Sequence, residues 1–419
     1  MVGVGNCLAP STARKSTLVM QKLYQLHDNT STAALPLHRV AMAFAIFDAS
    51  APYSYIFRIP ITYWYVVTLS AKLLVAIPLV TEFTISETSK RFIAFLVLVC
   101  ILSAAINQSN IEDIGQFLAF CAELLLTICV IRRSNLLAYT TVSVYTIFLS
   151  TIIYICVLYS GGIEAEWGRY SYFGDSHPNL GSEIIGISII LATFTMDIRR
   201  FIIVFIPSIY AILEMQGRSA ILASFIALFC VAARYMTRYQ RHLLLYVGAP
   251  ISILLLATFW QQCYAIFVSV FLVDDQYRGI DTGFVGRADL WGVAWALFEK
   301  SPIVGNGAGF FNTMGDVTAH NFFLYGLVEF GVLSLPVFWI LAKLLTNMLR
   351  GEFYRYSALS ALPIYWIFNA RFMNINPYPF LMFAVAFAYD NSGELKKRSG
   401  AATVRRTRVS SDHGARHCS

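Results

Sequence analysis

Charged residues are scarce in this sequence. Asp, Glu, Lys and Arg make up 13% of its 419 residues, whereas a soluble protein carries about 25%. Hydrophobic residues make up 57% of the chain, and apolar stretches recur along most of its length. These figures exclude a water-soluble enzyme, a disordered chain and a disulfide-stapled secreted module, and they predict a polytopic membrane protein.

Several other signals are missing. The eight cysteines follow no metal-ligand spacing, so we interpret them as small core residues. Nothing near the N-terminus resembles the apolar region of a cleavable signal peptide, so we expect insertion to begin with the first spanning helix. The net charge of +7 comes mainly from a basic C-terminal tail, which favours a solvated segment beside anionic lipid and not a nucleic-acid site.

The apolar windows predict an all-α fold. A spanning helix needs about 20 mostly apolar residues, and on that basis we expect a polytopic transmembrane helix bundle of about 12 spans, with an external loop that carries a short interfacial helix. Asp48 and Pro52 weaken the first span. The window at 243–273 is too long for one upright span, so we expect it to tilt, kink or project. The predicted spans lie near residues 40–57, 61–81, 92–106, 114–131, 136–158, 183–197, 200–215, 219–233, 243–273, 320–346, 357–370 and 377–390.

The cations set the predicted orientation, because short cytoplasmic connections retain Lys and Arg. With the N-terminus inside, 22 of the 31 Lys and Arg residues lie inside and seven lie outside, while Lys72 and Lys343 fall within spans. We therefore expect both termini in the cytoplasm. The external loops are then 159–182 and 274–319, and such long loops among short ones are usually functional or disordered. Their aromatic content favours function.

This topology divides the chain into five segments. We expect a cytoplasmic N-terminal segment, N-terminal transmembrane helices, a core with both external loops, C-terminal transmembrane helices and a basic cytoplasmic tail. Their expected bounds are residues 1–39, 40–158, 159–346, 347–390 and 391–419.

Arg218 lies outside in this topology, in a very short connection between two spans. The orientation rule works against an outer arginine, so something must hold it there. It is either a helix-end cation that reaches a lipid phosphate or a fixed guanidinium whose planar fork binds two phosphate oxygens. The sequence leaves both interpretations open.

Arg287 opens a run that continues to Glu299 and predicts an amphipathic helix. At about 100° per residue, one side holds Leu290, Trp291, Ala294, Leu297 and Phe298, and the other holds Asp289, Gly292, Ala296 and Glu299. Pro302 is expected to end the helix. We expect this helix on the membrane surface, with Arg287 reaching inward from its first turn. A purely interfacial anchor is the alternative.

Three glycines alternate at Gly305, Gly307 and Gly309. They do not form a dinucleotide loop, because Phe310 breaks the GxGxxG spacing and no strand precedes them. They either let backbone amides approach a ligand or make a turn against the bundle. We favour the turn.

His320 and Asn321 open the next span. The positive end of a helix disfavours a charged imidazole, so a neutral His320 is able to accept a proton. A hydrogen-bonded interfacial histidine is the alternative. Deeper in the same span, Glu329 is expected to be a buried structural acid paired with another helix.

The external loop at 159–182 interleaves aromatic and polar residues. This pattern suits carbohydrate, whose rings stack on aromatic faces while the hydroxyls take hydrogen bonds. An aromatic belt at the interface fits equally well.

The order of these residues resembles the O-antigen ligase and polymerase superfamily of bacterial polytopic glycosyltransferases. Three blocks carry the resemblance, which covers roughly residues 160–345. They are His177-Pro178-Asn179-Leu180-Gly181; Gly217-Arg218-Ser219; and the block 286–336, with Gly286-Arg287 and Trp291, Ser301-Pro302 with Gly305 and Gly307, His320-Asn321 with Leu324, then Glu329 and Gly331.

The resemblance implies a donor glycan on undecaprenyl diphosphate, passed to a hydroxyl at the periplasmic face of the bacterial inner membrane. Arg218 and Arg287 would bind the diphosphate, and His320 would act at the acceptor hydroxyl or beside the leaving phosphate. Arg169, Arg278 or Arg371 are alternatives to Arg218. The other predicted substrate contacts are Arg169, His177, Asn179, Arg278, Trp291 and Asn321.

No Asp-rich metal motif lies outside in this topology, so we expect transfer without metal or cofactor. The expected partners are the lipid-linked oligosaccharide, the bilayer, and the flippase and chain-length regulator of such a pathway. We favour a repeat-unit polymerase for exopolysaccharide, capsule or O-antigen, with a ligase that transfers glycan to lipid A core as the alternative. A polysaccharide transporter stays open, because Lys72 and Glu123 are midspan charges able to pair across helices. A structural scaffold would leave the outer arginines unexplained.

Overall fold

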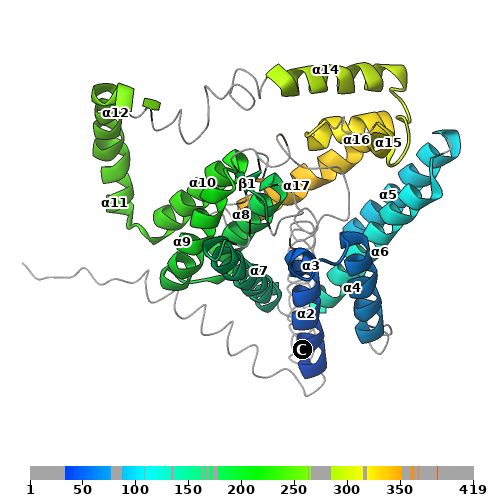
Figure 1. Ribbon diagram of the computed structural model, residues 1–419, viewed down its shortest axis with the longest axis horizontal. Helices are drawn as coiled ribbons and strands as arrows, with labels where there is room; N and C mark the ends of the chain where they lie inside the picture. The colour runs from blue at the N-terminus through cyan, green and yellow to red at the C-terminus, as the bar shows by residue number, and fades with distance from the viewer. Residues whose placement is uncertain are drawn as a thin grey trace, which may run out of the picture.

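The computed structural model (Figure 1) describes the helical body of the chain. It covers residues 34–76, 87–107, 109–133, 136–161, 163, 165–166, 169–172, 178–262, 264–265, 285–314, 319–351, 359, 361–362, 367 and 385. The predicted N-terminal segment and basic tail lie almost wholly outside these residues, as do most of the predicted spans 357–370 and 377–390.

The N-terminal half is a series of helices. These are α2 (Ala34–Ala49), α3 (Ala51–Ile56), α4 (Ile61–Ala76), α5 (Glu87–Asn107), α6 (Ile111–Arg133) and α7 (Leu136–Tyr159). A two-stranded antiparallel hairpin follows, formed by β1 (Ala165–Glu166) and β2 (Arg169–Tyr170). This hairpin is a small addition to the predicted all-α fold.

The second half is also helical. It contains α8 (Pro178–Thr195), α9 (Ile198–Glu214), α10 (Arg218–Tyr235), α11 (Arg238–Leu243), a π-helix (Leu244–Gly248), α12 (Ala249–Thr258), α14 (Val285–Lys300), α15 (Phe310–Thr313), α16 (Phe322–Phe330), a 3-10 helix (Gly331–Ser334) and α17 (Leu335–Gly351).

Six helical stretches of the described chain are long and apolar enough to cross a membrane. They are Glu87–Asn107, Ile111–Ile131, Leu136–Tyr159, Pro178–Thr195, Arg218–Tyr235 and Phe322–Arg350. The multi-pass architecture is thereby supported, whereas the count of about 12 spans stays a prediction.

Helix α8 is the centre of the bundle. Every residue from Gly181 to Phe194 is buried, and α8 packs against α7, α9 and α10. Near its start, Ser182 fills the space where Gly217, just before α10, lacks a Cβ. Near its end, the carbonyl of Thr193 accepts a hydrogen bond of 3.1 Å from Arg234 at the end of α10. Helices α8 and α10 therefore run side by side in the same direction.

Two predicted spans are broken. The first is interrupted at Ser50, between α2 and α3, with Pro52 in the first turn of α3. The predicted span 320–346 coincides with the candidate span Phe322–Arg350, but it is not one regular helix, because α16 ends at Phe330 and a 3-10 turn from Gly331 leads into α17. Gly331 has φ +61° and lies against the carbonyls of Pro302 and Ile303, a conformation and a close approach that favour glycine.

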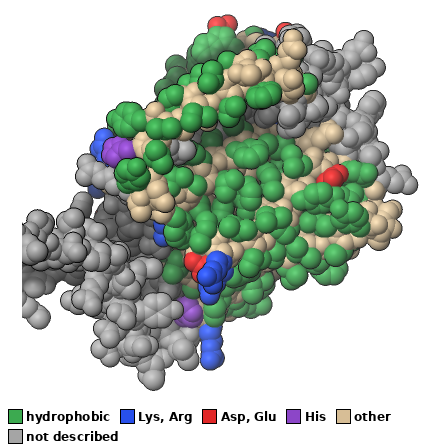
Figure 2. Space-filling model, turned by 90° about the vertical axis from the view of Figure 1, so that its left-hand side faces the viewer, with side chains coloured by type: hydrophobic (Ala, Val, Ile, Leu, Met, Phe, Trp, Pro, Cys, Tyr) green, Lys and Arg blue, Asp and Glu red, His purple; other side chains and the backbone are tan. Residues whose placement is uncertain are grey.

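The outer surface of α9, α10 and α12 is apolar. Exposed aliphatic and aromatic side chains cover all three helices, and Figure 2 shows a broad hydrophobic face on which charged side chains are few. Helix α12 has no buried residue and stands apart from the main bundle in Figure 1. The π-helix before α12 interrupts the helix within the long window at 243–273, where we expected a tilt, kink or projection.

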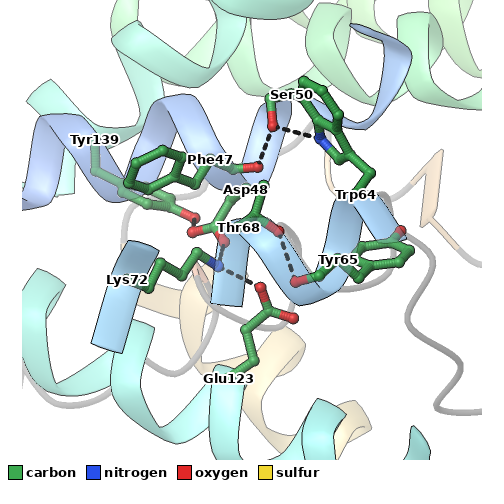
Figure 3. A network of polar contacts seen from close by, with 9 residues as sticks. All are labelled: Phe47, Asp48, Ser50, Trp64, Tyr65, Thr68, Lys72, Glu123 and Tyr139. Carbon is green, nitrogen blue, oxygen red and sulfur yellow. Dashed lines mark hydrogen bonds and ion pairs between the residues drawn. The ribbon is translucent and has the colours of Figure 1, made fainter. Parts of the chain in front are cut away.

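A buried ion network joins four N-terminal helices (Figure 3). Lys72 of α4 forms ion pairs with Asp48 of α2 and with Glu123 of α6, the latter at 2.5 Å. The Tyr139 hydroxyl of α7 donates to the second oxygen of Asp48 at 2.6 Å. The predicted pairing of Lys72 with Glu123 across helices is confirmed.

Removing Lys72 should destabilise this region strongly. In Lys72→Met the two carboxylates lose their shared cation while staying buried, which typically costs about 3–5 kcal/mol. The matched control is Lys90→Met, which removes an exposed pair with Glu87 at 3.1 Å, worth about 0–1 kcal/mol. Thermal unfolding of both variants in nanodiscs, followed by tryptophan fluorescence, tests the difference. Equal midpoints would contradict it.

Candidate functional site

The start of α10 lies against the start of α8. Gly217 occupies the N-cap position of α10 and Arg218 its first turn, half-buried. A Cβ on Gly217 would overlap Ser182, whose hydroxyl donates to the carbonyl of Asn179 at 2.9 Å. Two motifs that are about 40 residues apart in sequence, those of Asn179 and Arg218, therefore meet in space.

The hairpin loop is tied to the same region. Tyr172 is fully buried and its side chain fills the space beside Gly181 of α8. Its hydroxyl lies 2.8 Å from that of Ser150 in α7. Burial raises the pKa of the Tyr172 phenol, so this group stays neutral and serves as a structural anchor.

The second group of predicted residues lies where α14 packs against α16. Helix α14 has the predicted sidedness: Ala294 and Leu297 are buried, and Gly292, Ala296 and Glu299 on the other side are exposed. The indole N–H of Trp291 donates to the carbonyl of Ala319 at 3.0 Å, immediately before His320. The apolar side of α14 thus packs on protein, and its expected place at the membrane surface stays a prediction.

His320 itself has an unusual backbone. Its φ is +43°, a left-handed conformation that is uncommon for residues other than glycine and that clusters at functional sites. Asn321 is buried and caps α16, because its side-chain oxygen accepts from the amides of Phe323 and Leu324 at 3.0 and 3.1 Å. The bond from Trp291 and this cap hold His320 from both sides.

The three alternating glycines form a turn against the bundle, as we favoured. All three have positive φ. A Cβ on Gly305 would overlap the backbone of Glu329, one on Gly307 would overlap Ser109, and one on Gly309 would overlap Asp113. The space beside each glycine is therefore filled by protein, which explains why glycine stands at each position.

Glu329 is buried as predicted, and its carbonyl is part of this docking. It accepts from the amide of Gly307 at 3.0 Å and from the hydroxyl of Ser103 in α5 at 3.1 Å.

The side chains of five predicted residues lie outside the part of the chain that the structure describes. Arg278, His177 and Arg371 lie outside the described residues. For Arg169 and Arg287 the backbone is described, in β2 and in the first turn of α14, but not the side chains. That the Arg218 and His320 groups face one substrate stays a prediction.

Sequence reasoning missed three contributors: Ser109, Asp113 and Ser182. Ser109 and Asp113 lie in a polar connection between two predicted spans and Ser182 directly follows the block 177–181, but no pattern singled out these three residues. The glycines that lie against them, Gly217, Gly307 and Gly309, were the only indication of close contacts at these positions. Within the described residues, no three His, Cys, Asp or Glu side chains lie close enough together to hold a metal ion.

Gly305→Ala should destabilise the protein, whereas Gly292→Ala should not. The first adds a Cβ against the Glu329 backbone at φ +72°, and such strain costs about 1–3 kcal/mol. The second lies in α14 with open space around it, where alanine favours the helix by up to about 1 kcal/mol. Thermal midpoints in detergent compare the two. A Gly305→Ala protein as stable as Gly292→Ala would refute the docking of this turn.

Trp291→Phe should loosen the segment that carries His320. It keeps the ring but removes the hydrogen bond to Ala319, worth about 1 kcal/mol. Amide hydrogen exchange at residues 319–325 should speed up about fivefold. The control is Trp295→Phe, whose indole donates to Glu299 at 2.7 Å on the exposed side of the same helix. Identical exchange in both variants would argue against this role.

The comparisons with known proteins agree with the motifs. Residues 203–339 match a family model described as O-antigen ligase, and this segment contains Arg218, Arg287 and His320. No curated protein matches the chain. This segment, about a third of the chain, is thus similar to the O-antigen ligase family, in agreement with the resemblance that the motifs carry.

Proposed function

We propose that this protein polymerises oligosaccharide repeat units carried on undecaprenyl diphosphate, at the periplasmic face of the bacterial inner membrane. The product would be exopolysaccharide, capsule or O-antigen. The match of residues 203–339 to the O-antigen ligase family is the observation that carries the proposal. That family implies glycan transfer by a membrane protein, and the polymerase assignment goes beyond it.

The chemistry needs preorganised cations. The bond between the donor's anomeric carbon and its phosphate oxygen breaks, and the electron pair leaves with the diphosphate. Arg218 and Arg287 would stabilise this growing negative charge. The acceptor hydroxyl forms the new glycosidic bond and gives up its proton, which a neutral His320 would accept. Such general-base help typically contributes about 10²- to 10⁴-fold.

The backbone around His320 supports this role. A catalytic group must be held in a narrow range of positions. The Trp291 bond to Ala319 and the Asn321 cap restrict the segment on both sides of His320. Arg218 gains a similar restriction, because the preceding Gly217 packs against Ser182.

The orientation belongs to the proposal as well. The distribution of cations favours cytoplasmic termini, which puts the starts of α8 and α10 in the periplasm. Their mutual contact and the contact between their ends agree with the alternation that this orientation requires.

The midspan charges do not favour a transporter. Lys72, Asp48 and Glu123 are buried and bonded to one another. A transport pathway would need such charges to face a substrate or a water-filled cavity.

The decisive experiment gives the purified protein a defined diphospholipid-linked repeat unit and separates the products on a gel. A ladder supports the polymerase, and transfer only to added lipid A core supports the ligase. Arg218→Ala, Arg287→Ala and His320→Ala should fold and insert normally but make less than about 1% of the product.

Matched controls come from the same chain. Arg350→Ala removes an exposed arginine at the far end of α17, and His242→Ala removes an exposed histidine of α11. Both should keep wild-type activity. Normal product from His320→Ala or Arg287→Ala would overturn the enzymatic proposal.

A further inference from the structure

The corner between α5 and α6 lies outside the family-matched segment but contacts the turn that follows α14 within it. We call residues 103–107 and 109–113 the α5–α6 corner, and residues 301–309 the glycine-rich turn. Two of the three glycines in this turn, Gly307 and Gly309, lie against side chains of the corner. The corner is about 200 residues away in sequence.

Ser103 holds one side of this contact. Its hydroxyl lies 2.9 Å from the carbonyl of Val304 and 3.1 Å from that of Glu329, so its hydrogen is shared between the glycine-rich turn and the end of α16. The side-chain amide of Asn107 donates to the carbonyl of Ser103 at 2.9 Å. The glycine-rich turn and the end of α16 are thereby both fixed to α5.

Asp113 holds the other side. Its carboxylate accepts a hydrogen bond of 2.7 Å from the side-chain amide of Asn312 in α15, and the same carboxylate fills the Cβ space of Gly309. Hydrogen bonds to an ionised carboxylate are stronger than neutral ones. One acidic side chain therefore fixes both the last residue of the turn and the short helix that follows.

Helix α15 in turn packs against α16, so the position of α15 affects the position of α16. The ring of Phe311, beside Asn312, lies 4.4 Å from the ring of Tyr325 in α16. Phe311 is buried, so the contact does not slide freely. Tyr325 is one turn from the Asn321 cap, to whose carbonyl its amide donates at 2.8 Å.

We propose that Asp113 is a positioning residue for glycan transfer. By holding Asn312 and Gly309 it sets where α15 and the first turn of α16 lie, and hence where His320 meets the acceptor hydroxyl. The inference rests on the proposed function. It adds a residue of α6 to a predicted site whose three catalytic candidates, Arg218, Arg287 and His320, all lie in the family-matched residues 203–339.

The test uses the full chain in nanodiscs and compares four variants. Asp113→Ala removes the carboxylate, and Asp113→Asn keeps an oxygen able to accept from Asn312. Asn312→Ala removes the same hydrogen bond by deleting its donor, the exposed side chain of Asn312. Glu112→Ala is the matched control, since Glu112 is the neighbouring exposed acid of the same corner.

We expect kcat for transfer from the defined lipid-linked donor to fall about 10-fold in Asp113→Ala and Asn312→Ala, because small displacements of reacting groups cost up to about 100-fold. The KM for the donor should stay within about twofold, since Asp113 does not contact the diphosphate in this proposal. Asp113→Asn should keep at least about half of the wild-type kcat, and Glu112→Ala all of it.

A second measurement does not depend on activity. Amide hydrogen exchange over residues 309–314 and 319–325 should speed up in Asp113→Ala and not in Glu112→Ala. Unchanged exchange, a wild-type kcat in Asp113→Ala, or a higher donor KM at constant kcat would each overturn the inference. If Asp113→Ala does not fold, Asn312→Ala decides in its place.

The two proposals fail in different ways. A wild-type protein that transfers no glycan would refute the proposed function, and the exchange data alone would then decide whether Asp113 positions this segment. A wild-type protein that is active beside a fully active Asp113→Ala would refute only the role of Asp113.

Discussion

Three backbone hydrogen bonds join the glycine-rich turn to the end of α16 and the residues that follow it. Helix α16 ends at Phe330, so the carbonyls of Val328 and Glu329 need donors from elsewhere. The amides of Asn306 and Gly307 supply them at 2.8 and 3.0 Å, and Val332 donates back to Pro302 at 2.8 Å. In a membrane protein unpaired buried backbone groups are costly. The close approach that these bonds require is the reason for glycine in the turn.

Local patterns in the sequence predicted the parts of this region that depend on local forces. The run from Arg287 to Glu299 has a helical period and ends before a proline, and α14 forms there with the predicted side buried. Asn321 is a good capping residue and caps α16. The broken helix at Gly331 was not predicted, because the apolar pattern continues across it. Its cause is the distant contact with Pro302.

The sequence did not predict the contacts between segments that are far apart in the chain. Ser182 lies against Gly217 and Asp113 lies against Gly309, but the members of each pair are far apart in the chain and nothing in one sequence pairs them. The same limit applies to Trp291. The resemblance implied that Trp291 contacts the substrate, which stays a prediction, and nothing in the sequence indicated that its indole N–H donates to the carbonyl of Ala319.

The buried ion network and the Asp113 contact with Gly309 share helix α6. Glu123 follows Asp113 by ten residues on this helix, or about 15 Å along its axis. A slide of α6 by one turn would carry Glu123 about 5.4 Å from Lys72 and leave a buried charge unpaired, which is far costlier than the loss of an exposed hydrogen bond. The network therefore fixes the height of α6 in the bundle. That height decides where the Asp113 carboxylate meets Gly309, so a buried charge cluster in the N-terminal half sets the position of the turn that docks on the end of α16.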